Sequence, residues 1–134
     1  MTMADTIQRN AETQNLYREV NERVAEVNRR FAGGAAARTS SQLIEVFCEC
    51  GRNGPPCNDH VTVTAATYER IRADATTFVL HPGHGEASVE QVIERGDGFL
   101  IARNFGHAAA IARAADPRRV DGAAPEPGTA SPRT

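Results

Sequence analysis

The chain has 134 residues, a hydrophobic fraction of 40%, an aromatic fraction of 5% and no tryptophan, which suits one small domain with a thin core. Its formal charge of −2 is uneven: residues 1–39 carry six Arg against five acids, residues 40–103 five against nine, and residues 104–134 four against three. The sequence holds no apolar run of about 18 residues and no signal-peptide pattern, so we expect a cytoplasmic protein without a membrane span.

A long amphipathic helix and a flexible linker are expected over residues 1–39. Asp5 or Thr6 would start the helix, and Gly33-Gly34 would end it. Apolar residues recur every three or four positions and so share one stripe: Leu16, Val20, Val24, Val27 and Phe31. This stripe has two interpretations. It packs on the rest of the domain, or it pairs with a second copy or a partner protein as a short coiled coil.

Residues 40–103 predict a small, mainly antiparallel β domain with one short helix, so the fold class is α+β. "QLIEVFCE" and "HVTVT" are typical strands, and Thr64 can cap a helix in "AATYERIRAD". "TTFVLHPGH" predicts a third strand that ends at Pro82-Gly83. "SVEQVIERGDGFLIAR" favours a hairpin turning at Gly96-Asp97-Gly98, with a helix over residues 89–94 as the alternative.

Residues 104–134 are rich in Ala, Pro, Gly and Arg, which predicts a disordered C-terminal tail. Within it, "HAAAIARAA" also suits a weak helix. The folded part is then only about 60 residues, a size at which proteins often need a metal or a disulfide to supplement the core.

All three cysteines fall in the eleven residues "FCECGRNGPPC", which directs attention to metal or redox chemistry, since disulfides are uncommon in the cytoplasm. Cys48 and Cys50 end a strand, and Cys57 follows a turn-rich stretch, so three thiolates can converge on one ion. Zn²⁺ prefers four nitrogen or sulfur ligands, and a Cys3His set is a common structural site. On spacing alone the fourth ligand is open among three histidines: His84, His60 and His81.

Two other interpretations of the cysteines carry less weight. A redox pair usually has the spacing C-x-x-C at a helix start, whereas Cys48 and Cys50 are separated by one residue at a strand end. A catalytic zinc keeps one coordination position open for water and needs a nearby base. The nearby acids Glu45, Glu49 and Asp59 are expected to be solvated or to orient a ligand histidine.

The motifs "FCECG", a later Cys, "VTVTAATYERIRAD", "FVLHPGH" and "VIERGDGFLIAR" occur here in that order. Together they resemble a family of small, mostly uncharacterised actinobacterial proteins that begin with a helix similar to "LYREVNERVAEVNRRF". The resemblance covers about residues 14–103 and implies a metal set of Cys48, Cys50, Cys57 and His84. The stretch between Cys50 and Cys57 is longer than in that pattern, and the resemblance carries no activity with it.

These observations predict a non-catalytic, zinc-stabilised module for protein interaction or regulation, with no catalytic residues. One alternative is a nucleic-acid-associated zinc protein that uses the arginines of the first helix and the tail. The acidic middle segment disfavours it, because phosphate recognition needs a basic surface. A second alternative is a thiol-based redox sensor.

Overall fold

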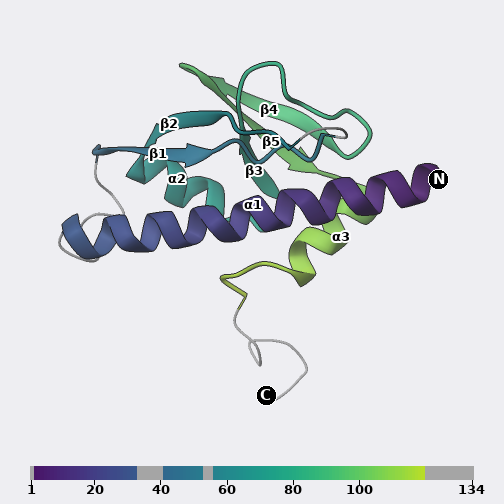
Figure 1. Cartoon of the computed structure of the whole chain (residues 1–134), viewed down its shortest axis with the longest axis horizontal. Helices are drawn as coiled ribbons and strands as arrows, with labels where there is room; N and C mark the ends of the chain where they lie inside the picture. Colours follow the sequence, from purple (N-terminus) through teal and green to yellow (C-terminus); the bar gives the residue numbers. More distant parts are fainter. Residues whose placement is uncertain (1, 33–40, 53–55, 120–134) are drawn as a thin grey trace, which may run out of the picture.

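A 30-residue helix runs along one side of the protein, and two small antiparallel sheets lie against it (Figure 1). The computed structural model describes residues 2–32, 41–52 and 56–119. The elements, in chain order, are α1 (Met3–Ala32), β1 (Leu43–Phe47), β2 (His60–Thr64), α2 (Ala65–Arg72), β3 (Thr77–Leu80), β4 (Glu90–Gly96), β5 (Phe99–Asn104) and α3 (Gly106–Ala114). This arrangement confirms the predicted α+β class. No helix in these ranges is long and apolar enough to cross a membrane.

The first sheet pairs β1 with β2, and the second has the order β3-β5-β4. Side chains along β1 and β2 alternate between buried and exposed, as the sequence predicts for strands covered on one face. Beyond β1 the chain continues toward the second sheet, because the Glu49 amide donates to the Val79 carbonyl of β3 at 2.8 Å. The stretch that contains Cys48 and Cys50 therefore connects the two sheets.

The predicted hairpin is confirmed as β4 and β5, and the helical alternative for residues 89–94 is wrong. Val92 pairs with Ala102, and a register shift follows between Val92 and Glu94. Gly98 has a φ of 83°, the left-handed conformation that glycine adopts without strain in a tight turn. The predicted cap of α2 is also confirmed, since the Thr64 hydroxyl accepts from the Thr67 amide at 3.0 Å.

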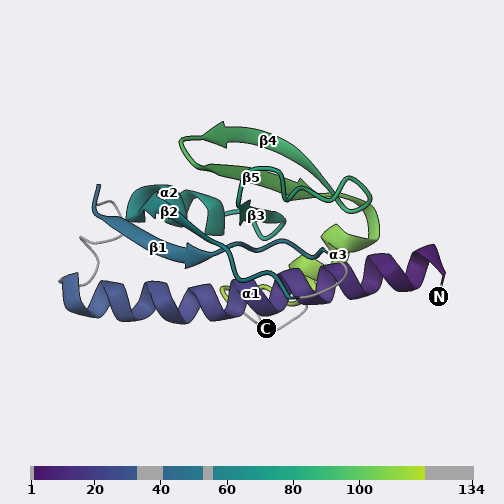
Figure 2. The same ribbon diagram turned by 45° about the horizontal axis from the view of Figure 1, so that its top comes forward.

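The C-terminal prediction needs a correction. Residues 104–134 were expected to form a disordered tail, but Gly106–Ala114 form α3. This helix buries Ala108, Ala109 and Ala112, and it packs against α1, which explains how a weak Ala-rich helix is held (Figure 2). Residues 120–134 of the predicted tail, and the Gly33-Gly34 helix stop, lie outside the described residues.

The buried side of α1 is not its apolar side. The residues that face the domain are Asn10, Ala11, Gln14, Arg18, Asn21 and Ala25. By contrast, Leu16 is 60% exposed, Val20 36% and Val27 52%. The interpretation that the apolar stripe packs on the domain is therefore wrong for these three residues, although the half-buried Val24 does touch the core. The side chain of Phe31 lies outside the described residues.

Hydrogen bonds to distant parts of the chain explain why this polar side is inside. The Gln14 amide donates to the Glu90 carboxylate at 2.6 Å. Arg18 donates to the backbone carbonyls of Ala75 at 2.5 Å and Ala112 at 2.8 Å. The Asn21 side chain bonds both the amide and the carbonyl of Phe47, each at 2.9 Å. Buried polar groups are tolerated when they are paired in this way. Because hydrogen bonds are directional, they fix the orientation of α1 on the domain in addition to the area that the helix buries.

The start of α1 also differs from the expected Asp5 or Thr6. The helix begins at Met3 because Thr2 caps it. The Thr2 hydroxyl accepts from the Asp5 amide at 3.1 Å, and the Asp5 carboxylate accepts from the Thr2 amide at 3.2 Å. This is the reciprocal capping box, in which two helix-end amides are satisfied together.

At Gly51 the backbone of α1 closely approaches the cysteine-rich segment. A Cβ atom at this position would overlap the backbone carbonyl oxygen of Asn10 and lie 2.9 Å from Gln14 Cγ. The glycine after Cys50 is therefore required by the helix that packs over it, because any side chain would push the helix away.

We predict that Gly51→Ala destabilises the protein by about 2–3 kcal/mol, since the overlap involves backbone that cannot rotate aside. Gly85→Ala is the matched control, because its Cβ would meet only Val92 Cγ2 at an ordinary 3.6 Å. Urea unfolding followed by circular dichroism measures both variants. Equal stability of the two would contradict the close approach of α1 to Gly51.

Candidate metal centre

Three cysteines and one histidine converge between the two sheets. The ligand atoms of Cys48, Cys50, Cys57 and His84 all lie within 4.8 Å of one another. Cys48 and Cys50 are fully buried, at 0% and 1% exposure, and belong to a core cluster with Leu80 and Leu100. The four side chains therefore form a compact group of soft and borderline ligands at the edge of the core, which is the chemistry of a metal-binding group.

Two segments far apart in the sequence supply this group. Cys48 follows β1, where its amide extends the ladder by donating to the Asp59 carbonyl at 2.9 Å. His84 closes a turn in which its amide donates to the His81 carbonyl at 3.1 Å. Gly83, with a φ of 87°, follows Pro82 in the pattern of a type II turn. The imidazole of His84 then lies with its Nδ1 atom 3.5 Å from the Sγ atoms of both Cys48 and Cys57.

The other two candidate histidines lie outside this group. His60 is exposed, and its ring stacks on Phe47 with the centroids 4.5 Å apart. The imidazole of His81 lies 5.0 Å from that of His84, with Nδ1 3.1 Å from the Pro82 carbonyl oxygen. His81 contributes through its backbone instead, because its amide donates to Cys48 Sγ at 3.1 Å. Such a bond favours a thiolate at Cys48.

Asp59 lies on the far side of the His84 ring. Its Oδ2 atom is 3.3 Å from His84 Nε2, the nitrogen that points away from the sulfurs. A proton on Nε2 leaves Nδ1 with a free lone pair directed at the cysteines. The pair therefore has the arrangement in which a carboxylate sets the tautomer and orientation of a ligand histidine. Of the three nearby acids, Asp59 is the one that contacts His84.

The thiols influence one another strongly. A hydrogen bond from Cys48, with others from His84 and from the backbone, lowers the pKa of Cys50 to about 5. The same contact with Cys50, together with burial, raises the pKa of Cys48. Burial likewise raises the pKa of Cys57. Three like charges cannot accumulate in so small a space unless a cation neutralises them.

Glu49, the residue between the two buried cysteines, points away from them and into an ion pair with Arg72. The two carboxylate oxygens accept from the Arg72 guanidinium at 2.7 and 2.8 Å, and both side chains are essentially inaccessible, at 0% and 1% exposure. Burial alone would lower the pKa of Arg72, but the adjacent carboxylate outweighs it and raises that pKa. The carboxylate also accepts from Asn21 of α1 at 2.7 Å and from the Val79 amide of β3 at 3.0 Å.

This ion pair was not predicted from the sequence, from which Glu49 was expected to be solvated or to orient a histidine. A signal was present, because strand alternation puts residue 49 on the opposite side from residues 48 and 50. The partner Arg72 lies 23 positions further on, at the end of a helix whose rotation was not known. The role of Tyr17 was missed for the same reason: its hydroxyl donates to the Cys57 carbonyl at 3.0 Å.

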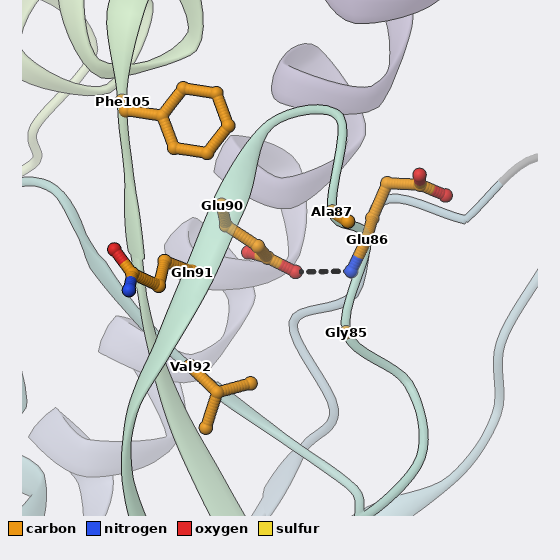
Figure 3. Close-up of a pocket in the computed structure, with 7 residues that line it drawn as sticks. All are labelled: Gly85, Glu86, Ala87, Glu90, Gln91, Val92 and Phe105. Carbon is orange, nitrogen blue, oxygen red and sulfur yellow. Dashed lines mark hydrogen bonds between the residues drawn. The ribbon is translucent and has the colours of Figure 1, made fainter.

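A surface cavity of about 490 Å³ adjoins the His84 turn but is separate from the cysteines. It is lined by Gly85, Glu86, Ala87, Glu90, Gln91, Val92 and Phe105, none of which is a cysteine or histidine (Figure 3). The Glu90 carboxylate lies between β4 and the 85–87 segment, where it accepts from the Glu86 amide at 3.0 Å. Burial raises the pKa of Glu90 to about 7, and the charges of Cys50 and Glu86 act in the same direction.

Comparisons with known proteins add no further constraint on the site. No protein-family model, no curated protein and no solved structure matches the chain. The resemblance to actinobacterial proteins therefore stays a prediction.

We predict that Arg72→Met lowers the free energy of unfolding by about 3–5 kcal/mol, because it leaves the buried Glu49 carboxylate without its charged partner. Arg70→Met, on the same helix, is the control. It breaks an equally well-formed pair with Glu94, at 2.9 Å, but that pair is exposed and contributes less than about 1 kcal/mol. Chemical denaturation of both variants gives the comparison, and a small effect at position 72 would show that Glu49 is not held as described.

We also predict a pH-dependent gain in stability for Glu90→Gln. Because the folded protein raises the pKa of Glu90 from 4.5 to about 7, the proton on Glu90 stabilises the fold and is lost as the pH rises. The variant should therefore gain stability relative to the original protein between about pH 4.5 and 7, levelling at no more than about 3.5 kcal/mol. If the difference in unfolding free energy between the two proteins does not change with pH, the buried placement of Glu90 is contradicted.

Proposed function

We propose that the protein is a non-catalytic, zinc-stabilised module for protein interaction or regulation. In this proposal Cys48, Cys50, Cys57 and His84 bind one Zn²⁺, and the exposed side of α1 binds another protein. The observation that carries the metal part is the convergence of three sulfurs and one imidazole nitrogen from two distant segments.

The spacing of the ligand atoms supports zinc as the ion. With Zn–S bonds of about 2.3 Å and Zn–N bonds of about 2.05 Å, a tetrahedral site separates sulfur from nitrogen by about 3.6 Å. The separation from His84 Nδ1 to Cys48 Sγ and to Cys57 Sγ is 3.5 Å in both cases. The buried position and the soft ligand set also favour Zn²⁺ over Mg²⁺ or Ca²⁺, which prefer oxygen ligands.

A structural role follows from a complete set of protein ligands. A catalytic zinc ion keeps one position for water, whereas four protein ligands fill the tetrahedron. The ion would join the segment after β1 to the turn at His84, across 36 positions of the chain, beside a core cluster of only a few residues. Closing so long a loop stabilises a small domain, because it removes conformational freedom from the unfolded chain.

Two of the arginines that nucleic-acid binding would use, Arg18 and Arg118, are engaged within the fold. Arg18 is 1% exposed and bonds backbone carbonyls. Arg118 donates to the carboxylates of Glu22 at 2.6 Å and Glu69 at 2.7 Å, which leaves little of its charge for phosphate. This supports a protein partner over a nucleic acid. The burial of Cys48 and Cys50 similarly favours a scaffold over a thiol sensor, because sensor thiols are accessible.

A graded set of variants tests the metal part. We predict one zinc per chain by elemental analysis of the purified protein. His84→Ala should lower zinc affinity most, and Asp59→Asn should lower it by about 10–100-fold, since Asp59 acts only through His84. His60→Ala is the control, because its exposed ring lies against Phe47 and outside the candidate metal groups. Competition with a chromophoric chelator measures all three.

The stability of the same proteins completes the test. Removing zinc, or replacing Cys57 by Ser, should unfold the strands while leaving part of α1 helical, because metal binding and folding are coupled. A purified chain that contains no transition metal and still melts cooperatively, unaffected by chelator, would refute the zinc proposal.

A further inference from the structure

The outer side of α1 carries an aligned apolar row that the exposed Arg23 interrupts between Val20 and Val27. Leu16, Val20 and Val27 are 60%, 36% and 52% exposed, and at 100° per residue they fall within about 40° of one another around the helix. We call these three residues the outer row. It faces away from the domain, because the buried residues Gln14, Arg18 and Asn21 lie on the opposite side. Single exposed apolar residues are common, but an aligned row on one helix is typical of a helix-pairing surface.

Charged residues spaced seven positions apart border the outer row along one flank. The acidic residues are Glu12, Glu19 and Glu26. The basic residues beside them are Arg23 and Arg30. All five are exposed. The other flank is occupied by the half-buried Tyr17 and Val24, which contact the domain. A partner helix therefore meets a mixed-charge flank on one side only.

This one-sided pattern is complementary to a second copy of the same helix. When two copies of a helix pair antiparallel about a twofold axis, the same flank of each copy faces the other. If Leu16 of one copy lies opposite Val27 of the second, then Arg23 lies opposite Val20, next to Glu19 of the second copy. In the same register Arg30 lies next to Glu12 of the second copy. The symmetry makes each contact twice, which gives four opposite-charge pairs and two Leu16–Val27 contacts, set against one approach of Arg23 to its own copy across the twofold axis.

A parallel arrangement lacks this complementarity. Parallel pairing sets the charged flank of one copy against the Tyr17 and Val24 flank of the other, where Glu19 and Glu26 would meet apolar side chains. The existing bond from Arg30 to Glu26, at 3.1 Å, does not oppose the antiparallel contacts. Both of its side chains are more than half exposed, and such pairs exchange easily.

We propose that the protein forms an antiparallel homodimer through the outer row of α1, with Leu16 opposite Val27 and with Arg23 and Arg30 paired to Glu19 and Glu12 of the second copy. This deepens the proposed function by naming its partner, and it rests on that proposal only in requiring α1 to stay docked on the zinc-stabilised body. The contact is small, so the dimer exchanges with monomer as the concentration falls.

Sedimentation equilibrium of the full chain, loaded with zinc, tests the proposal across micromolar concentrations. The original protein should show a monomer–dimer equilibrium. Leu16→Asp should weaken dimerisation at least 100-fold without changing the zinc content, because it puts a charge into the apolar contact. An unchanged equilibrium for this variant would overturn the outer row as the interface.

A charge exchange tests the register. Glu19→Arg and Arg23→Glu should each weaken the dimer about tenfold, because each sets like charges against each other, and the double variant should restore it to within about threefold. Arg9→Glu is the matched control. In the proposed register Arg9 extends beyond the last residue of the partner helix, so its replacement should have no effect, whereas in a parallel pair it would face its own copy. Failure of the double variant to recover, or an effect at Arg9, would overturn the antiparallel register.

The two proposals fail separately. A zinc-containing protein that is monomeric at every concentration would overturn the homodimer and leave the zinc scaffold intact. A folded, zinc-free dimer would overturn the zinc scaffold and leave the outer row in place.

Discussion

The orientation of the Cys48–Cys50 segment depends on the buried carboxylate between the two cysteines. Strand alternation puts both sulfurs on one side only if Glu49 is held on the other. A buried carboxylate is tolerated only when it is paired, and Glu49 is paired by Arg72 of α2, by Asn21 of α1 and by the Val79 amide of β3. Three elements from distant parts of the chain must therefore be in place before the three thiols can converge. The Cys/His group is thus coupled to the whole fold, although its four side chains come from two short segments.

The fold compensates for a thin apolar core with directional contacts. The core divides into small clusters, one of which includes the buried cysteines themselves. Between the clusters lie the Glu49–Arg72 pair, the Gln14–Glu90 bond and the contacts of Arg118 with Glu22 and Glu69. Each polar group costs free energy when buried and recovers it only with the correct partner, so these contacts select one arrangement more than they add stability. An ion that ties Cys48 to His84 would supply the stability that such contacts do not.

Features determined by neighbouring residues were predictable from the sequence. Alternation in β1 and β2, the turn at Gly98 and the Thr64 cap all depend on residues a few positions apart, and all are confirmed. The convergence of the cysteines with a histidine was predictable because few residue types bind zinc. The buried side of α1 was not, because the partners of Gln14 lie 76 and 90 positions away. Hydropathy marks the apolar side of a helix, and it identifies the inner side only when the protein offers an apolar surface to cover it. Here the domain offers backbone carbonyls and a carboxylate instead.

Because α1 buries its polar side and exposes its apolar side, hydrogen bonds determine its position on the domain. A helix docked by apolar contacts alone can slide or rotate at small cost, whereas one docked by Gln14, Arg18 and Asn21 loses several hydrogen bonds for any displacement. The inner side therefore holds the helix in one position without using its apolar residues. Those residues are then presented to solvent at a fixed orientation, with rotation and register already determined. A surface that is ordered before binding loses less conformational entropy when it associates. For this reason three modest side chains on a rigidly held helix make a better contact surface than the same three on an isolated helix.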